Sequence, residues 1–134
     1  MALELRELAG MTHELVAALK EMGINDSDEL LAATAQRKDR DSLATNLGVE
    51  AHAVLQMANR ADLARIRGIG KSYSDLLELT GVDTVMELKQ RNADNLYAKI
   101  VEIAKEKGFK RYPREDEVHA WVYQAQQLDR ALFY

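Results

Sequence analysis

The feature that most constrains the fold is an internal repeat, in which two segments of the chain match at a constant offset of 58 residues. At this offset Gly10 aligns with Gly68 and Gly23 aligns with Gly81, and no gap is needed. Each copy has the pattern of a turn, a helix, a Gly-Ile or Gly-Val turn and a second helix. Because repeats dictate architecture, we expect two similar helical units related by an approximate two-fold axis.

The first turn of the second copy, residues 65–72, has the pattern of a helix-hairpin-helix turn. Gly68 and Gly70 bracket Ile69, and glycine adopts positive φ without steric cost. We expect both glycines to permit a tight reversal, with Gly70 needing positive φ and Ile69 pointing into the core. The helix after Gly70 begins with N–H groups that lack intrahelical partners and lie at the positive end of the helix dipole. This turn is therefore a candidate site for an anion such as a DNA phosphate.

The corresponding turn of the first copy departs from this pattern. Thr12 stands in place of the second glycine, and the acidic Glu14 follows it. We therefore expect the first turn to pack within the protein and to bind no phosphate.

The remaining segments predict further helices and no strands. A short helix within 42–47 and a connector helix within 52–60 precede the second copy, and an apolar stripe within 96–104 follows it. After Pro113, apolar residues around Trp121 recur at intervals of three and four, which predicts a last helix that clamps across both copies. We expect one all-α domain, residues 1–134, with a first copy at 5–34, connector helices at 38–63, a second copy at 64–92 and C-terminal helices at 93–134.

Composition narrows the classes of protein. The chain has 134 residues, 47% of them hydrophobic, so it is long enough to bury a core. It has no cysteine and no apolar run of about eighteen residues, which argues against disulfides, a signal peptide and a membrane span. We expect a cytoplasmic protein without membrane contact.

Charge is distributed unevenly along the chain, although the net charge is only −4. Residues 1–58 carry 5 basic and 10 acidic side chains, residues 59–114 carry 12 and 8, and residues 115–134 carry 1 and 4. Since nucleic-acid binders usually show a basic surface, the middle segment is the part that could supply one. An ordinary solvated surface explains the same counts about equally well.

Nothing in the sequence indicates catalysis or a cofactor. The three histidines, His13, His52 and His119, lie far apart, and none pairs with another at a metal-ligand spacing, so we assign no metal. Carboxylates lie at helix starts and on polar faces, where capping explains them. Gly68-Ile69-Gly70 lacks the third glycine and the preceding strand of a dinucleotide fingerprint.

Two basic groups remain as candidates for nucleic-acid binding. The first lies at the hairpin and comprises Arg65, Arg67 and Lys71, together with Gly68, Ile69, Gly70 and Ser72 of the turn. The second comprises Lys105, Lys107, Lys110, Arg111 and Arg114, interleaved with Phe109 and Tyr112. Basic side chains with aromatic neighbours can follow a phosphate backbone and stack on unpaired bases, although charged faces more often only solvate a helix.

Several segments resemble one protein family. The matching residues are Asn59–Leu63, Arg65–Gly70, Gly81–Val85, Glu87, Leu88, Arg91, Asn92, Asn95 and Leu96, with Pro113, Val118, Trp121 and Ala125 in the last helix. They resemble a family named only as a domain of unknown function, whose number in words is four-three-three-two.

This resemblance covers nearly the whole chain and implies a tandem helix-hairpin-helix fold, the class seen in DNA repair and recombination factors. The class implies sequence-independent DNA binding, in which hairpin amides bind phosphates and hairpin carbonyls sometimes hold a monovalent cation. Ser74 stands where the class usually has alanine, a small residue that preserves close helix approach.

We interpret the chain as a non-catalytic binding module that binds DNA weakly, without sequence preference, through residues 65–72. The alternative is a protein-interaction or scaffolding domain, in which the hairpins are structural and the acidic first half meets a basic partner. In that case Leu132, Phe133 and Tyr134 could extend an exposed apolar strip for self-association. The oligomeric state stays open.

Overall fold

The computed structural model describes residues 2–134, and within this range the chain is all-helical, with eight α-helices and no strand. The elements are the 3-10 turn η1 (Leu5–Glu7) and the helices α1 (His13–Glu21), α2 (Ser27–Ala33), α3 (Arg37–Leu47), α4 (Ala51–Leu63), α5 (Lys71–Leu79), α6 (Val85–Lys89), α7 (Ala93–Lys107) and α8 (Glu115–Gln126). The expected all-α fold class is confirmed.

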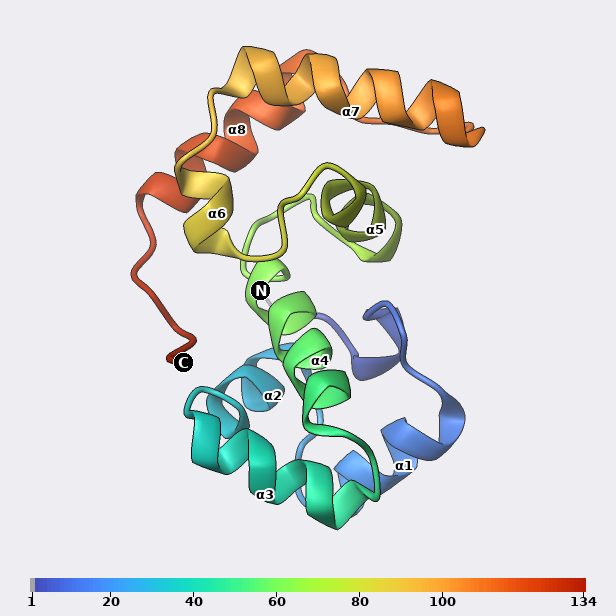
Figure 1. Cartoon of the computed structure of the whole chain (residues 1–134), viewed down its shortest axis with the longest axis vertical. Coiled ribbons are helices and arrows are strands. Elements are labelled where there is room, and N and C mark those ends of the chain that lie inside the picture. The colour runs from blue at the N-terminus through green and yellow to red at the C-terminus, as the bar shows by residue number, and fades with distance from the viewer. Residues whose placement is uncertain (1) are drawn as a thin grey trace.

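The buried apolar side chains form two clusters, one in each half of the molecule (Figure 1). The first core combines η1 and α1–α4, and its buried members are Leu5, Leu8, Leu19, Ile24, Leu30, Leu31, Leu43, Ala44, Val54, Met57, Ala58, Ala61, Ala64 and Leu132. The second core combines α5–α8, and its buried members are Leu63, Ile66, Ile69, Leu76, Leu77, Val82, Val85, Leu88, Leu96, Ile100, Ala104, Val118, Trp121, Val122 and Ala125. Helix α4 contributes to both cores and so connects the halves.

The turns of the two halves have the same local backbone path at the offset of 58 residues. Gly10 and Gly68 have φ of 84° and 98°, and Gly23 and Gly81 have φ of 82° and 89°. The helices agree too, because α1 and α5 both have nine residues and begin at positions 13 and 71. A positive φ at each of these turns explains why glycine stands there in both copies.

Side-chain caps begin the helix after each second turn, as the sequence predicts. Asp26 Oδ1 accepts the N–H of Glu29 at 2.8 Å before α2, and Thr84 Oγ1 accepts the N–H of Glu87 at 3.3 Å before α6. In both copies the glutamate carboxylate accepts the N–H of the residue that precedes the cap. These reciprocal bonds satisfy amides that the helix itself leaves free.

Helix α3 is longer than the predicted short helix within 42–47, because it begins at Arg37. The added turn is rich in charge and carries no apolar stripe. Arg40 explains it, since this side chain is only 4% exposed and its guanidinium donates to the carbonyls of Thr34, Ala35 and Phe133 at 2.8, 3.1 and 2.8 Å. The buried Arg40 therefore anchors the first turn of α3, where a sequence pattern would show an apolar residue.

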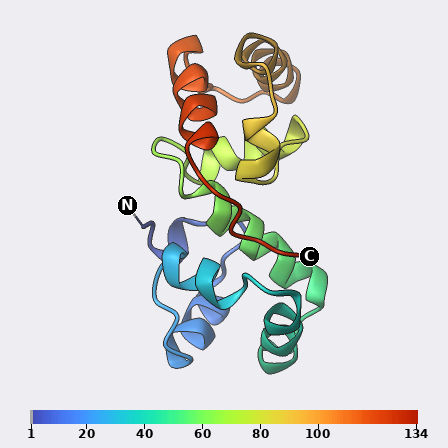
Figure 2. The same ribbon diagram turned by 90° about the vertical axis from the view of Figure 1, so that its left-hand side faces the viewer.

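The last helix does not clamp across both halves. Helix α8 packs on α6 and α7, and Trp121 is buried in the second core alone. The segment after α8 makes the connection instead, because it runs beside α4 toward the first half (Figure 2) and buries Leu132 in the first core. Burial removes Leu132 from the proposed exposed apolar strip, while Phe133 and Tyr134 remain exposed.

Candidate nucleic-acid interface

The turn between α4 and α5, which we call the second hairpin (residues 65–72), is anchored from inside. Ile66 donates its N–H to the carbonyl of Leu63 at 3.0 Å, and Ile69 donates to the carbonyl of Ile66 at 3.3 Å. Both isoleucine side chains are buried in the second core, as the sequence predicts for Ile69. The chain reverses at Gly68, where φ is +98°.

Helix α8 covers this turn and fixes it. A β-carbon on Gly68 would lie 2.9 Å from Nε1 of Trp121, so the indole rests directly against the glycine. Gln124 holds the backbone of Arg67 from both sides: its Oε1 accepts the Arg67 N–H at 2.8 Å and its Nε2 donates to the Arg67 carbonyl at 3.2 Å. No sequence pattern singles out Gln124. The second hairpin is therefore rigidly presented, and the Arg67 amide is already used.

Gly70 does not have the positive φ that we expected. Its φ is −104° and its ψ is −157°, and a β-carbon there would meet nothing within 4 Å. The reversal is complete at Gly68, and Gly70 is the N-cap of α5, a position that uses extended backbone. Other residues therefore fit at Gly70, whereas Gly68 is constrained by both its φ and Trp121.

The first turn of α5 has no side-chain cap, because its N-cap residue has no side chain. Ser74 donates to the carbonyl of Gly70 at 3.0 Å, which closes the first helical turn. Among the residues that the structure describes, the amides of Lys71, Ser72 and Tyr73 find no acceptor. Three N–H groups at the positive end of a helix dipole thus remain for an external partner.

The first hairpin, around Gly10, has a side-chain cap at the corresponding helix start. Thr12 occupies the N-cap of α1, with φ of −103° against −104° at Gly70, and its Oγ1 accepts the N–H of Leu15 at 3.2 Å. The two caps have nearly the same backbone angle, and the threonine hydroxyl satisfies an amide that glycine leaves free.

Arg65 lies at the second hairpin, and its guanidinium is engaged by groups of the protein itself. Its guanidinium donates to Oδ1 of Asp62 at 2.9 and 2.6 Å and to the carbonyl of Asp129 at 3.0 Å. Asp62 is 2% exposed, and its Oδ2 accepts the N–H of Val85 at the start of α6. Arg65 and Asp62 therefore tie α4, α6 and the C-terminal segment together, which leaves Arg67 and Lys71 as the exposed cations of the first group.

A cavity of about 400 Å³ opens beside the free amides. Its lining residues are Leu3, Glu7, Gly68, Gly70, Lys71, Ser72, Tyr73 and Arg111. Arg111 belongs to the second basic group of the sequence, so the fold brings one member of that group to the second hairpin. Tyr73 lies between the cavity and the core, with its ring centroid 5.3 Å from that of Trp121. Glu7 adds one acidic group to the rim.

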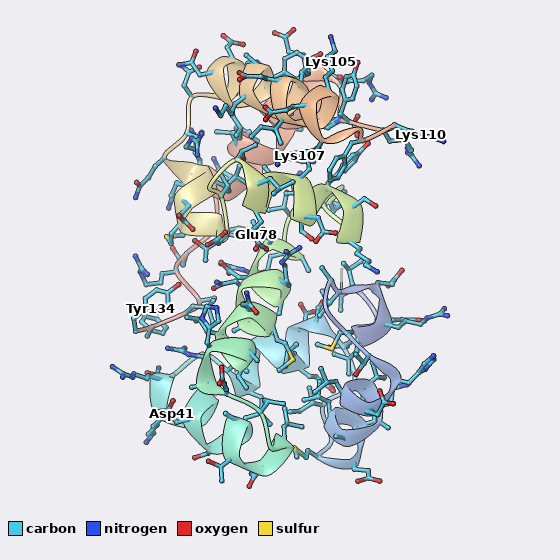
Figure 3. The ribbon with its side chains drawn as sticks, turned by 45° about the vertical axis from the view of Figure 1, so that its right-hand side comes forward. Asp41, Glu78, Lys105, Lys107, Lys110 and Tyr134 are labelled. Carbon is cyan, nitrogen blue, oxygen red and sulfur yellow. The ribbon has the colours of Figure 1, made fainter. Side chains whose placement is uncertain are left out.

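The other members of the second basic group do not line the hairpin cavity. Lys105 and Lys107 are exposed on the last turn of α7, and Lys110 is exposed in the segment that follows (Figure 3). Arg114 pairs with Asp116 at 3.1 Å, and this hydrogen bond raises the pKa of the guanidinium and lowers the pKa of the Asp116 carboxyl. The charge of Arg114 is therefore already paired with carboxylates in the first turn of α8.

No helix in residues 2–134 has the length and apolar character that crossing a membrane requires.

Comparison with known proteins gives one match. No curated protein and no solved structure matches the chain. A family model described as a domain of unknown function (DUF4332) matches residues 9–128, which include both glycine turns, both cores' helices and Trp121. The chain therefore belongs to this family of unknown function.

Proposed function

We propose that the chain is a non-catalytic module that binds the phosphate backbone of nucleic acid through the second hairpin, in the manner of a helix-hairpin-helix motif. The uncapped start of α5 carries this proposal. Three amides without acceptors lie there, beside the exposed side chains of Arg67 and Lys71. Helix N-termini bind anions because their N–H groups and the helix dipole both favour negative charge.

The comparison with Thr12 supports an external ligand. An N-cap side chain often satisfies one of the free amides at a helix start, as Thr12 does in α1. At α5 the same backbone position carries glycine, although a β-carbon at Gly70 would meet no neighbour. Packing therefore does not require glycine at this position. Glycine lets a bulky phosphate approach the amides.

Such a site recognises phosphate and reads no bases. Among the described residues, Lys71 and Arg111 line the cavity and Arg67 is an exposed residue of the second hairpin, so few phosphates are neutralised. Sequence-independent binding with a dissociation constant of about 1–100 μM at physiological salt is the expectation for such contacts. The affinity falls steeply as salt rises, because counterions compete for the backbone.

A protein partner is the alternative, and Glu7 is the observation that favours it. This carboxylate lines the same cavity as Lys71 and Arg111, so the rim has mixed charge. A partner loop that carries a basic group beside a polar or acidic one would pair with Glu7 and also use the free amides.

The test compares two charge reversals that change net charge equally. Arg67→Glu with Lys71→Glu reverses the field at the second hairpin, while Arg37→Glu with Lys38→Glu reverses two exposed cations of α3 in the first half. Fluorescence anisotropy with labelled duplex and single-stranded DNA is measured between about 50 and 200 mM salt. The hairpin pair should weaken binding to every sequence and flatten the salt slope by about 2, whereas the α3 pair should leave the slope unchanged.

Two results contradict the proposal. If both double variants weaken binding equally, only the net charge matters and the second hairpin is no site. If the wild-type chain binds no DNA at about 50 mM salt, where the electrostatic contribution is large, the amides serve a protein partner or only the fold.

A further inference from the structure

Three potential metal ligands meet at the start of α7 and α8, far from the second hairpin in sequence. They are Asp94, Glu115 and His119, and one donor atom from each lies within 4.8 Å of the other two. His119 Nε2 lies 2.7 Å from Asp94 Oδ1 and 3.9 Å from Glu115 Oε1. His119 has no ligand-type partner at a recognisable spacing in the sequence, because only the fold brings Asp94 beside it.

Two packed helices hold the three side chains. Glu115 and His119 are four residues apart on α8, so they share one face of that helix. Asp94 lies in the first turn of α7, which is begun by the Asn92 cap, whose Oδ1 accepts the N–H of Asn95 at 3.0 Å. The two helices pack against each other, so the three positions have a fixed spacing.

No lysine or arginine neutralises the two carboxylates. Within residues 2–134, Asp94 and Glu115 form ion pairs with His119 alone, and the neighbouring Arg114 pairs with Asp116 and Glu117 instead. The cluster therefore offers two negative charges and one imidazole nitrogen without a fixed positive partner. A divalent cation would supply that charge.

We propose that Asp94, Glu115 and His119 bind a divalent transition-metal ion of the Zn²⁺ type, with water at the fourth position. Ligand atoms at 2.0–2.2 Å in a tetrahedron are about 3.4 Å apart, and the 2.7 and 3.9 Å separations lie on either side of that value. Small side-chain rotations would therefore suffice. The imidazole ligand favours Zn²⁺ over Mg²⁺ and Ca²⁺, which prefer oxygen ligands.

The test is isothermal titration of the full chain, freed of metal by dialysis against a chelator, with ZnCl₂ at neutral pH. One Zn²⁺ should bind per chain. His119→Ala and Asp94→Asn should each weaken binding roughly tenfold or more, a loss that even an outer partner of a ligand produces. His52→Ala, which removes an exposed histidine of α4, is the matched control and should leave Zn²⁺ affinity unchanged.

Three results overturn the proposal. They are no Zn²⁺ binding by the wild-type chain, unchanged binding in His119→Ala, and equal losses in His119→Ala and His52→Ala. Because all three ligands are exposed, circular dichroism should show the variants fully folded. DNA binding should be the same in His119→Ala and in the wild type, so the outcome is independent of the proposed function.

Discussion

The two hairpins of this protein have similar φ at their reversal glycines and at their helix caps but differ in what surrounds them. At the first, Thr12 caps its own helix, and a β-carbon on Gly10 would meet nothing within 4 Å. At the second, Gly70 leaves α5 uncapped, and Trp121 lies against Gly68. The first turn is therefore partly capped and open to solvent, whereas the second is braced by α8 and leaves one more amide free. The proposed site needs a braced turn whose helix start has no side-chain cap, and only the second hairpin combines the two properties.

The largest effect should come from Trp121→Ala, which removes the brace of the second hairpin. The indole is 2% exposed and lies in the middle of the second core, so its loss should cost about 3–5 kcal/mol of unfolding free energy. Urea denaturation monitored by circular dichroism measures this loss. A change below about 1 kcal/mol would show that the second hairpin does not depend on α8.

Leu132→Ala tests the connection between the halves. Leu132 is 2% exposed in the first core although it follows α8, so we expect a loss of about 2–5 kcal/mol in the same denaturation experiment. Phe133→Ala is the control, because that ring is 44% exposed and should contribute under about 1 kcal/mol. Equal effects of the two changes would mean that the C-terminal segment does not join the first core.

Alanine at the two reversal glycines separates backbone strain from the contact with Trp121. Gly10→Ala meets only the strain of positive φ, about 1–2 kcal/mol. Gly68→Ala meets that strain and also the indole, which adds about 1–3 kcal/mol of overpacking. Thermal and urea unfolding should rank Gly68→Ala as clearly more destabilised. If Gly10→Ala were the more destabilised variant, the contact between Gly68 and Trp121 would not constrain the second hairpin as described.

The smallest effect concerns Asp83, which occupies the position of Asn25 in the first half. Burial, with help from Glu87 and Glu78, raises the pKa of the Asp83 carboxyl against the opposing effect of Arg60. A raised pKa of a carboxyl group means that the folded state holds its proton more tightly than the unfolded state. The chain thus loses stability as pH rises through the folded pKa of Asp83.

Asp83→Asn should therefore stabilise the chain at neutral pH, and the gain should vanish in acid, where aspartate is itself protonated. Since the group is only partly buried, screening keeps the gain below about 1 kcal/mol. Melting temperatures at pH 7 and near pH 3 measure it. A gain that is the same at both values would exclude a charge effect.

Much of this fold could be predicted from the sequence, because local patterns encode it. Glycines at constant spacing mark turns with positive φ, and Asp26 and Thr84 are recognisable caps. The apolar spacing around Trp121 correctly predicts its burial. The approximate two-fold relation of the two copies stays a prediction.

The remaining features depend on contacts between distant segments. Arg40 is buried where it donates hydrogen bonds to three backbone carbonyls. Gln124 accepts the N–H of Arg67 only because α8 lies beside that residue. Likewise, Gly68 and Gly70 look alike in sequence, and the position of Trp121 is what distinguishes them. Side chains that satisfy distant polar groups leave no periodic pattern.

Contacts between distant segments also decide which basic residues lie at the candidate site. In the sequence Arg65 looks like Arg67 and Lys71, because the hydrogen bonds from its guanidinium to Asp62 leave no sequence pattern. The sequence also separates Arg111 from the hairpin, although the two lie at one cavity.

The most direct test of the central claim exchanges the two caps and measures DNA affinity at low salt. Gly70→Thr gives α5 the cap of α1 at a position where a β-carbon fits, so the chain should stay folded. The threonine hydroxyl accepts the N–H of Tyr73, as Thr12 does for Leu15, and the side chain obstructs the amides of Lys71 and Ser72. A lost hydrogen bond to a charged group costs about 1.5–3 kcal/mol, so Kd should rise roughly tenfold or more. Thr12→Gly should leave Kd unchanged, and an unchanged Kd in Gly70→Thr would contradict the account.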